Sequence, residues 1–96
     1  MNVLITYDVN TEDKAGQRRL AKVARLCKDY GRRVQNSVFE CMLSEVQLLE
    51  LTNKLEKTMD TQSDSIRVYY LNRSENRRVI VLGKNDTVNV DGMLII

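Results

Sequence analysis

The chain has 96 residues, of which 43% are hydrophobic and 29% are charged, with a formal net charge of +2. This size predicts one domain, residues 1–96, whose small core would be stabilised by a partner subunit. No apolar run approaches the ~18 residues of a membrane span. The absence of histidine excludes Ser-His-Asp and Cys-His mechanisms and every histidine metal site. Two widely spaced cysteines, Cys27 and Cys41, indicate reduced thiols and a cytoplasmic location.

The first third of the chain combines a buried strand with a basic helix. Residues 2–8 are β-branched and apolar, which predicts a mostly buried strand. A polar loop follows, in which Asn10 or Thr11 is expected to cap the next helix. Apolar residues then recur at helical spacing over residues 14–30. Gly31 is predicted to end this helix in the left-handed conformation.

The middle of the chain predicts two short strands and a second helix. Residues 33–43 are extended in character, with a turn or bulge expected at Asn36-Ser37. Ser44 opens the second helix through a capping box with Gln47. The residues at helical spacing that we expect in the core are Leu48, Leu51, Leu55 and Met59.

The last third is predicted to complete a sheet. Residues 65–71 and 79–82 are typical of strands, joined by a charged loop over 72–78. Residues 82–96 are expected to form a short additional strand and an apolar tail that packs on a partner subunit. The order of elements predicts an α+β fold, a ferredoxin-like βαββαβ sandwich with this extra strand. Its sheet would be antiparallel, with both helices on one face and the other face open to a partner.

Positive charge is concentrated in residues 14–33, which hold eight Lys or Arg residues and one acid. Such a block is typical of a surface that binds a polyanion. The alternative is a helix face that is merely solvated. The candidate contacts to nucleic acid are Lys14, Arg18, Arg19, Lys22, Arg32 and Arg33.

Asp8 is the sharpest candidate for chemistry. It ends the first predicted strand, just before the basic helix. A carboxylate there suits Mg²⁺ or Mn²⁺ and a phosphodiester substrate. The alternative is an acid that caps a helix or pairs with an arginine. One carboxylate supplies only part of an octahedral metal site. Water, phosphate oxygens or a second Asp8 across a two-fold axis would supply the other ligands.

Several stretches of the chain resemble the Cas2 family, small proteins of CRISPR adaptation, the step that captures foreign DNA as new spacers. The residues that carry the resemblance are Tyr7-Asp8-Val9, the Arg18-Arg19 pair, Lys22, and the run Tyr30-Gly31-x-Arg33-Val34-Gln35-x-Ser37-Val38-Phe39-Glu40. The resemblance implies a ferredoxin-like homodimer in which Asp8 approaches its mate, binds a divalent metal and is the catalytic residue. It also implies that the protein sits between dimers of the CRISPR integrase and holds the DNA to be inserted. The positions it marks as supporting activity or substrate binding are Tyr7, Arg19, Arg33 and Phe39. For Tyr7 and Phe39 the alternative is an ordinary place in the core.

The substrate stays open between several interpretations. The resemblance implies Mg²⁺-dependent endonucleases that act on single-stranded RNA or on double-stranded DNA. An aromatic content of 5% offers few platforms for stacking single strands, so we expect duplex DNA. A single-stranded-RNA endoribonuclease and a non-catalytic scaffold that holds duplex DNA are the alternatives. A small-molecule regulator is disfavoured, because the chain has no glycine-rich phosphate loop.

Overall fold

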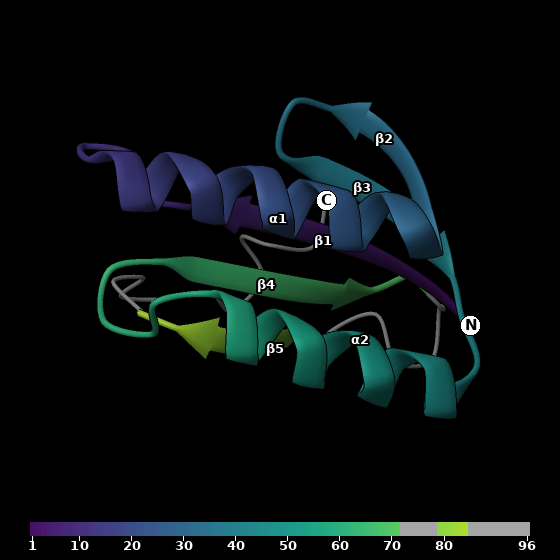
Figure 1. Cartoon of the computed structure of the whole chain (residues 1–96). Helices are drawn as coiled ribbons and strands as arrows, with labels where there is room; N and C mark the ends of the chain where they lie inside the picture. Colours follow the sequence, from purple (N-terminus) through teal and green to yellow (C-terminus); the bar gives the residue numbers. More distant parts are fainter. Residues whose placement is uncertain (72–78, 85–96) are drawn as a thin grey trace.

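The strands and helices follow one another in the predicted order. The computed structural model describes residues 1–71 and 79–84. The elements are β1 (Asn2–Asp8), α1 (Lys14–Tyr30), β2 (Gly31–Gln35), β3 (Val38–Met42), α2 (Glu45–Thr58), β4 (Ser65–Tyr70) and β5 (Val79–Gly83). The strands form one sheet in the order β2-β3-β1-β4-β5, and every neighbouring pair is antiparallel. Both helices lie side by side on the same face of this sheet (Figure 1).

The predicted α+β class and antiparallel sheet are therefore confirmed. The strand predicted at residues 79–82 is β5, which follows the six elements of the βαββαβ order. The predicted loop 72–78 and the tail 85–96 lie outside the described residues. Neither described helix combines the length and apolarity that crossing a membrane would require.

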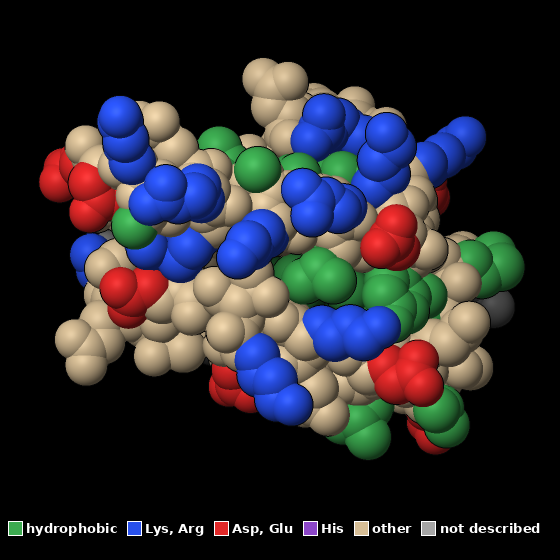
Figure 2. Space-filling view, in the orientation of Figure 1, with side chains coloured by type: hydrophobic (Ala, Val, Ile, Leu, Met, Phe, Trp, Pro, Cys, Tyr) green, Lys and Arg blue, Asp and Glu red, His purple; other side chains and the backbone are tan. Residues whose placement is uncertain are grey.

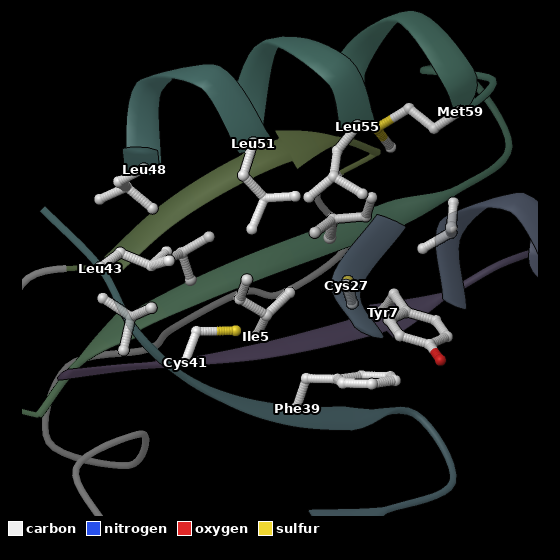
Figure 3. Close-up of a cluster of buried hydrophobic side chains, with 14 of the residues drawn as sticks. Ile5, Tyr7, Cys27, Phe39, Cys41, Leu43, Leu48, Leu51, Leu55 and Met59 are labelled. Atoms are coloured by element: carbon white, nitrogen blue, oxygen red, sulfur yellow. The ribbon is translucent and has the colours of Figure 1, made fainter. Parts of the chain in front are cut away.

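The core lies between the helices and one face of the sheet. Along β1, Val3, Ile5 and Tyr7 are buried, while the alternate residues are not, which is the period of two expected for a half-buried strand. The predicted stripe of α2 is confirmed, since its four members all lie in this core (Figure 3). The capping box between Ser44 and Gln47 is also confirmed.

Both cysteines are free and belong to the core. Burial raises the pKa of the Cys27 thiol to about 12 and that of Cys41 to about 11. Since the thiolate is the reactive form, both groups are unreactive at neutral pH. They contribute to packing and leave the site chemistry to other residues.

The prediction for the start of α1 was wrong, because Asp13 is the N-cap. Its side chain accepts a hydrogen bond from the Gly16 backbone N–H at 2.8 Å. Asn10 has other partners: its backbone N–H donates to Asp64 at 3.0 Å, its carbonyl accepts from Arg19 Nη2 at 3.5 Å, and its side-chain oxygen accepts from the Glu12 N–H at 2.9 Å. The Asn10 side chain is thus engaged within the loop, and Asp13, directly before the first helical residue, caps α1.

The predicted left-handed conformation of Gly31 was also wrong. Its φ of −164° and ψ of −156° are extended, and it begins β2 opposite Cys41. A Cβ at this position would lie 2.4 Å from the Cys41 sulfur. Glycine is needed here because two strands approach closely, and not because the helix needs a left-handed end.

The predicted division of residues 33–43 is confirmed. Residues Asn36 and Ser37 separate β2 from β3, and the pairing register shifts between Arg33 and Gln35. The polar pair therefore marks the turn, as predicted, and the irregularity in pairing lies just before it in β2.

Candidate functional site

Asp8 is the last residue of β1 and is exposed on the face of the sheet that the helices leave open. It is paired with Ser65 of β4, which in turn is paired with Gly83 of β5. A shallow pocket of about 330 Å³ opens beside it. The residues that line this open-face pocket are Thr6, Tyr7, Asp8, Ser65, Arg67, Tyr69 and Lys84.

The oxygen chemistry of this pocket fits a hard divalent cation. Mg²⁺ is commonly held by one or two carboxylates and completes its shell with water and substrate phosphate oxygens. Asp8 supplies one such carboxylate. Among residues 1–71 and 79–84, no three His, Cys, Asp or Glu side chains gather where they could hold a metal. Among the described residues that line the pocket, Asp8 is therefore the single charged ligand.

Arg67 and Lys84 are site residues that the sequence interpretation missed. In β4, Ile66 and Val68 are buried, so Arg67 between them points to the open face. That alternation was readable in the sequence, but the neighbours of Arg67 were not. Lys84 reaches the same pocket because β5 pairs with β4, which only the tertiary structure shows.

The basic residues of α1 lie on the other side of the sheet from Asp8. Lys14, Arg18 and Lys22 are exposed, and none of them lines the open-face pocket. Basic side chains extend along α1 toward the β2 edge (Figure 2). The described part of the chain thus presents two separate cationic regions: a broad one over α1, and a small one beside Asp8.

Arg19 differs from the other predicted contacts because its guanidinium is engaged inside the protein. Its Nε donates to Asp64 at 2.9 Å and its Nη2 donates to the same carboxylate at 3.4 Å. The side chain is 21% exposed, and that of Asp64 is fully buried. The structure therefore places Arg19 in an internal ion pair.

Asp64 is a third residue that the sequence interpretation missed. Besides Arg19, its carboxylate accepts hydrogen bonds from the backbone N–H groups of Asn10 and Asp60, at 3.0 and 2.9 Å. Burial raises the pKa of this carboxyl, but the bond from Arg19 and the two backbone bonds outweigh burial, so the pKa is lowered from its ordinary 3.8. Asp64 thus joins the loop after Asp8, helix α1 and the loop before β4.

The remaining predicted site residues lie on β1 and on the hairpin of β2 and β3, and they are Tyr7, Arg32, Arg33 and Phe39. Tyr7 and Phe39 are 5% and 1% exposed, with ring centroids 6.1 Å apart. The Arg33 guanidinium lies 5.2 Å from the centre of the Phe39 ring, and Arg32 makes only a long 3.5 Å contact to Glu40. Tyr7 and Phe39 therefore belong to the core, while Arg32 and Arg33 are exposed on β2.

The chain is similar to known proteins over nearly its whole length. A protein-family model described as CRISPR associated protein Cas2 matches residues 1–79. The CRISPR-associated endoribonuclease Cas2 1 of Moorella thermoacetica is 46% identical over 96 residues, which cover 100% of both chains. The CRISPR-associated endonuclease Cas2 of Halalkalibacterium halodurans is 43% identical over 95 residues, or 99% of each chain. The crystal structure of Streptococcus pyogenes Cas2 at pH 6.5 superimposes with a TM-score of 0.71 at 52% identity, covering 86% of this chain and 100% of that one.

Proposed function

The chain belongs to the Cas2 family of CRISPR-associated proteins, and from this we propose that it is a metal-dependent endonuclease of CRISPR adaptation. Asp8 is its catalytic residue and the bonds it hydrolyses are phosphodiesters of nucleic acid. The observation that supports this most is the position of Asp8, an exposed carboxylate in a pocket that also contains two cationic side chains. The relatives named above are called an endoribonuclease and an endonuclease, which supports the same class of chemistry.

Asp8 would hold Mg²⁺ or Mn²⁺ as the charged ligand of the site. When bound, the ion would polarise the scissile phosphate and lower the pKa of a bound water, which makes a nucleophile available without histidine. The contribution of the chain is to place this carboxylate on a rigid strand end. Pairing with Ser65 and the tethered loop at Asn10 support that placement.

Duplex DNA is the substrate that the basic surface favours. Lys and Arg side chains spread along one helix suit contacts to successive backbone phosphates, which position a duplex without reading its sequence. Single-stranded RNA is the alternative substrate, and the name of the Moorella relative, an endoribonuclease, favours RNA. A scaffold that holds duplex DNA for the CRISPR integrase is a further alternative, because the surface of α1 is separate from the Asp8 pocket and needs no cleavage to bind.

Cleavage assays separate these functions. Wild-type protein and the Asp8→Asn variant should be compared on linear duplex DNA and on single-stranded RNA, with Mg²⁺ and with EDTA. Cleavage by wild type alone, abolished by EDTA, supports the endonuclease, and the preferred substrate identifies its class. Binding of duplex without cleavage by either protein would favour the scaffold.

Reversing the charge of three α1 residues is expected to weaken duplex binding by about a hundredfold or more, because each phosphate contact releases counterions. The substitutions are Lys14→Glu, Arg18→Glu and Lys22→Glu, all on the exposed face. Arg19 stays unchanged, since a glutamate there would face the buried Asp64. Fluorescence anisotropy over a series of salt concentrations measures the effect.

The matched control for this triple variant is Lys57→Glu, a charge reversal on the exposed face of α2. It should leave the affinity and its salt dependence nearly unchanged. Equal duplex affinity in the triple variant and wild type would show that the α1 face is an ordinary solvated surface that does not bind duplex.

The open face of the sheet supports the proposed ferredoxin-like homodimer, in which the two Asp8 residues approach a two-fold axis. Leu4 lies on this face, only partly buried, between Glu40 and Tyr69. We expect sedimentation at micromolar concentration to give twice the 11.1 kDa of one chain. Leu4→Asp should dissociate the dimer, whereas Leu49→Asp on the outer face of α2 should not. A monomeric wild type would overturn the dimer.

A further inference from the structure

We infer that Arg67 and Lys84 bind the substrate phosphodiester beside Asp8, as a local phosphate site distinct from the basic surface of α1. This inference rests on the proposed nuclease function, because it assigns the residues that hold the group to be cleaved. Neither Arg67 nor Lys84 belongs to the stretches of sequence that resemble the Cas2 family.

Pairing of three strands brings both cations to Asp8. Arg67 of β4 is paired with Thr6, two residues before Asp8 on the same face of β1. Lys84 directly follows Gly83, which is paired with Ser65, the partner of Asp8. All of these positions except Gly83 line the open-face pocket. Strands β1, β4 and the end of β5 therefore each contribute to it.

The backbone at the end of β5 is held in a way that places Lys84. Gly83 has φ of +83°, a conformation that favours glycine, and a Cβ there would lie 2.4 Å from the Asp64 carbonyl oxygen. The Lys84 N–H donates to that carbonyl at 2.8 Å. The strand therefore ends against the buried Asp64, and this contact places Lys84 at the rim of the pocket.

The charges of the pocket match a phosphodiester. Among the described residues that line it are one acid, Asp8, two bases, Arg67 and Lys84, and three residues with hydroxyl groups, Thr6, Ser65 and Tyr69. A phosphodiester carries one negative charge and accepts charge-assisted hydrogen bonds, which Arg and Lys donate strongly. A divalent cation at Asp8 would offset the repulsion between this carboxylate and the phosphate. The two basic side chains would add hydrogen-bond donors to the phosphate oxygens that the cation does not contact.

Within one subunit, the basic side chains of α1 do not reach a phosphate that is bound beside Asp8. They lie on the helix side of the sheet and none lines the pocket. They are suited to position a long backbone, whereas a phosphate at Asp8 requires donors on the open face. The two cationic regions therefore have different tasks: the α1 surface binds the polymer and the pocket binds the scissile group.

Dimethyl phosphate is a probe that separates these tasks, because it is a phosphodiester too small to contact both regions. It should be titrated into ¹⁵N-labelled full-length protein at low salt while amide shifts are recorded by NMR. We expect saturable shifts at Thr6, Ser65, Arg67 and Lys84. Arg67→Gln and Lys84→Gln should each raise the dissociation constant about tenfold, as expected for loss of one charge-assisted bond.

Two further variants make the result specific to charge. Arg67→Lys keeps the positive charge and should retain most of the affinity, so a loss in Arg67→Gln alone cannot come from misfolding. Lys57→Gln removes a cation from the exposed end of α2 and should bind as wild type does. Absence of saturable shifts at the pocket, or wild-type affinity in both Gln variants, would overturn the inference.

This titration involves no cleavage, so it can fail independently of the proposed function. Pocket binding that depends on Arg67 and Lys84 supports the phosphate site even if Asp8→Asn cleaves as wild type does, which would overturn the nuclease. Metal-dependent cleavage lost in Asp8→Asn, with no phosphate binding at the pocket, would keep the nuclease and overturn this site.

Discussion

Replacing Asp8 with asparagine is expected to reduce Mg²⁺-dependent cleavage by at least about a hundredfold. Loss of a group that merely supports a metal ligand typically costs 10–100-fold in metal affinity or activity, and here the charged ligand itself would be lost. Asparagine keeps the shape of the side chain. The fold does not depend on the Asp8 carboxylate, which makes no hydrogen bond or ion pair with another described residue. The loss should therefore be specific to chemistry.

The measurement compares the two proteins from parallel preparations on both substrates, with metal and with EDTA. Duplex affinity should be preserved in Asp8→Asn, because the α1 surface is unchanged. Glu56→Gln, which removes an exposed acid from α2, serves as the matched control and should cleave as wild type does. Equal cleavage by Asp8→Asn and wild type would place the nuclease activity elsewhere or in a contaminant.

Removing the Asp64 side chain is expected to lower the free energy of unfolding by about 3 kcal/mol, because Asp64→Ala leaves buried hydrogen-bond donors without partners. The backbone N–H groups of Asn10 and Asp60 both donate to this carboxylate. For a domain of this size, the midpoint of thermal unfolding should fall by roughly 10–20 °C. Circular dichroism during heating measures the change. An unchanged midpoint would show that water replaces the carboxylate without cost.

The stabilisation by Asp64 is expected to depend on pH in the acid range. Its pKa in the folded protein is lowered from 3.8, so its contribution is complete above that pH and is lost as pH falls through the folded pKa. Wild type should therefore lose stability in acid more steeply than Asp64→Asn, and the difference between them should shrink toward low pH. Urea unfolding at several pH values measures this, with Glu56→Gln as the control. A difference that stays constant across the acid range would contradict the assignment.

Features that depend on near neighbours in the chain could be predicted from the sequence. The strand at residues 2–8, the apolar stripe of α2 and the Ser44 capping box each follow from residue types within a short stretch, and all were confirmed. The same holds for the turn at Asn36 and Ser37, which polar residues marked. Local hydrogen bonding and periodic burial act at this range, so the amino-acid pattern contains the information.

The roles of charged residues depended on partners that are distant in the chain. Arg19 and Arg18 are neighbours in one basic block, yet Arg19 pairs with Asp64, 45 residues away, while Arg18 remains exposed. The same buried carboxylate also accepts from the Asn10 N–H, and so links the loop before α1 to the loop before β4. Long-range pairing of this kind has no local signal, because it arises when separate elements pack together.

By itself, the sequence determined the class of fold, the order of its elements, the family and Asp8 as the candidate for chemistry. Only the tertiary structure decided what surrounds Asp8. Strand pairing placed Arg67 and Lys84 beside it, and the layered arrangement put the exposed cations of α1 on the far side of the sheet. The physical reason is that the face to which a side chain points follows from local periodicity, whereas its neighbours on that face follow from which strands pair and in what register.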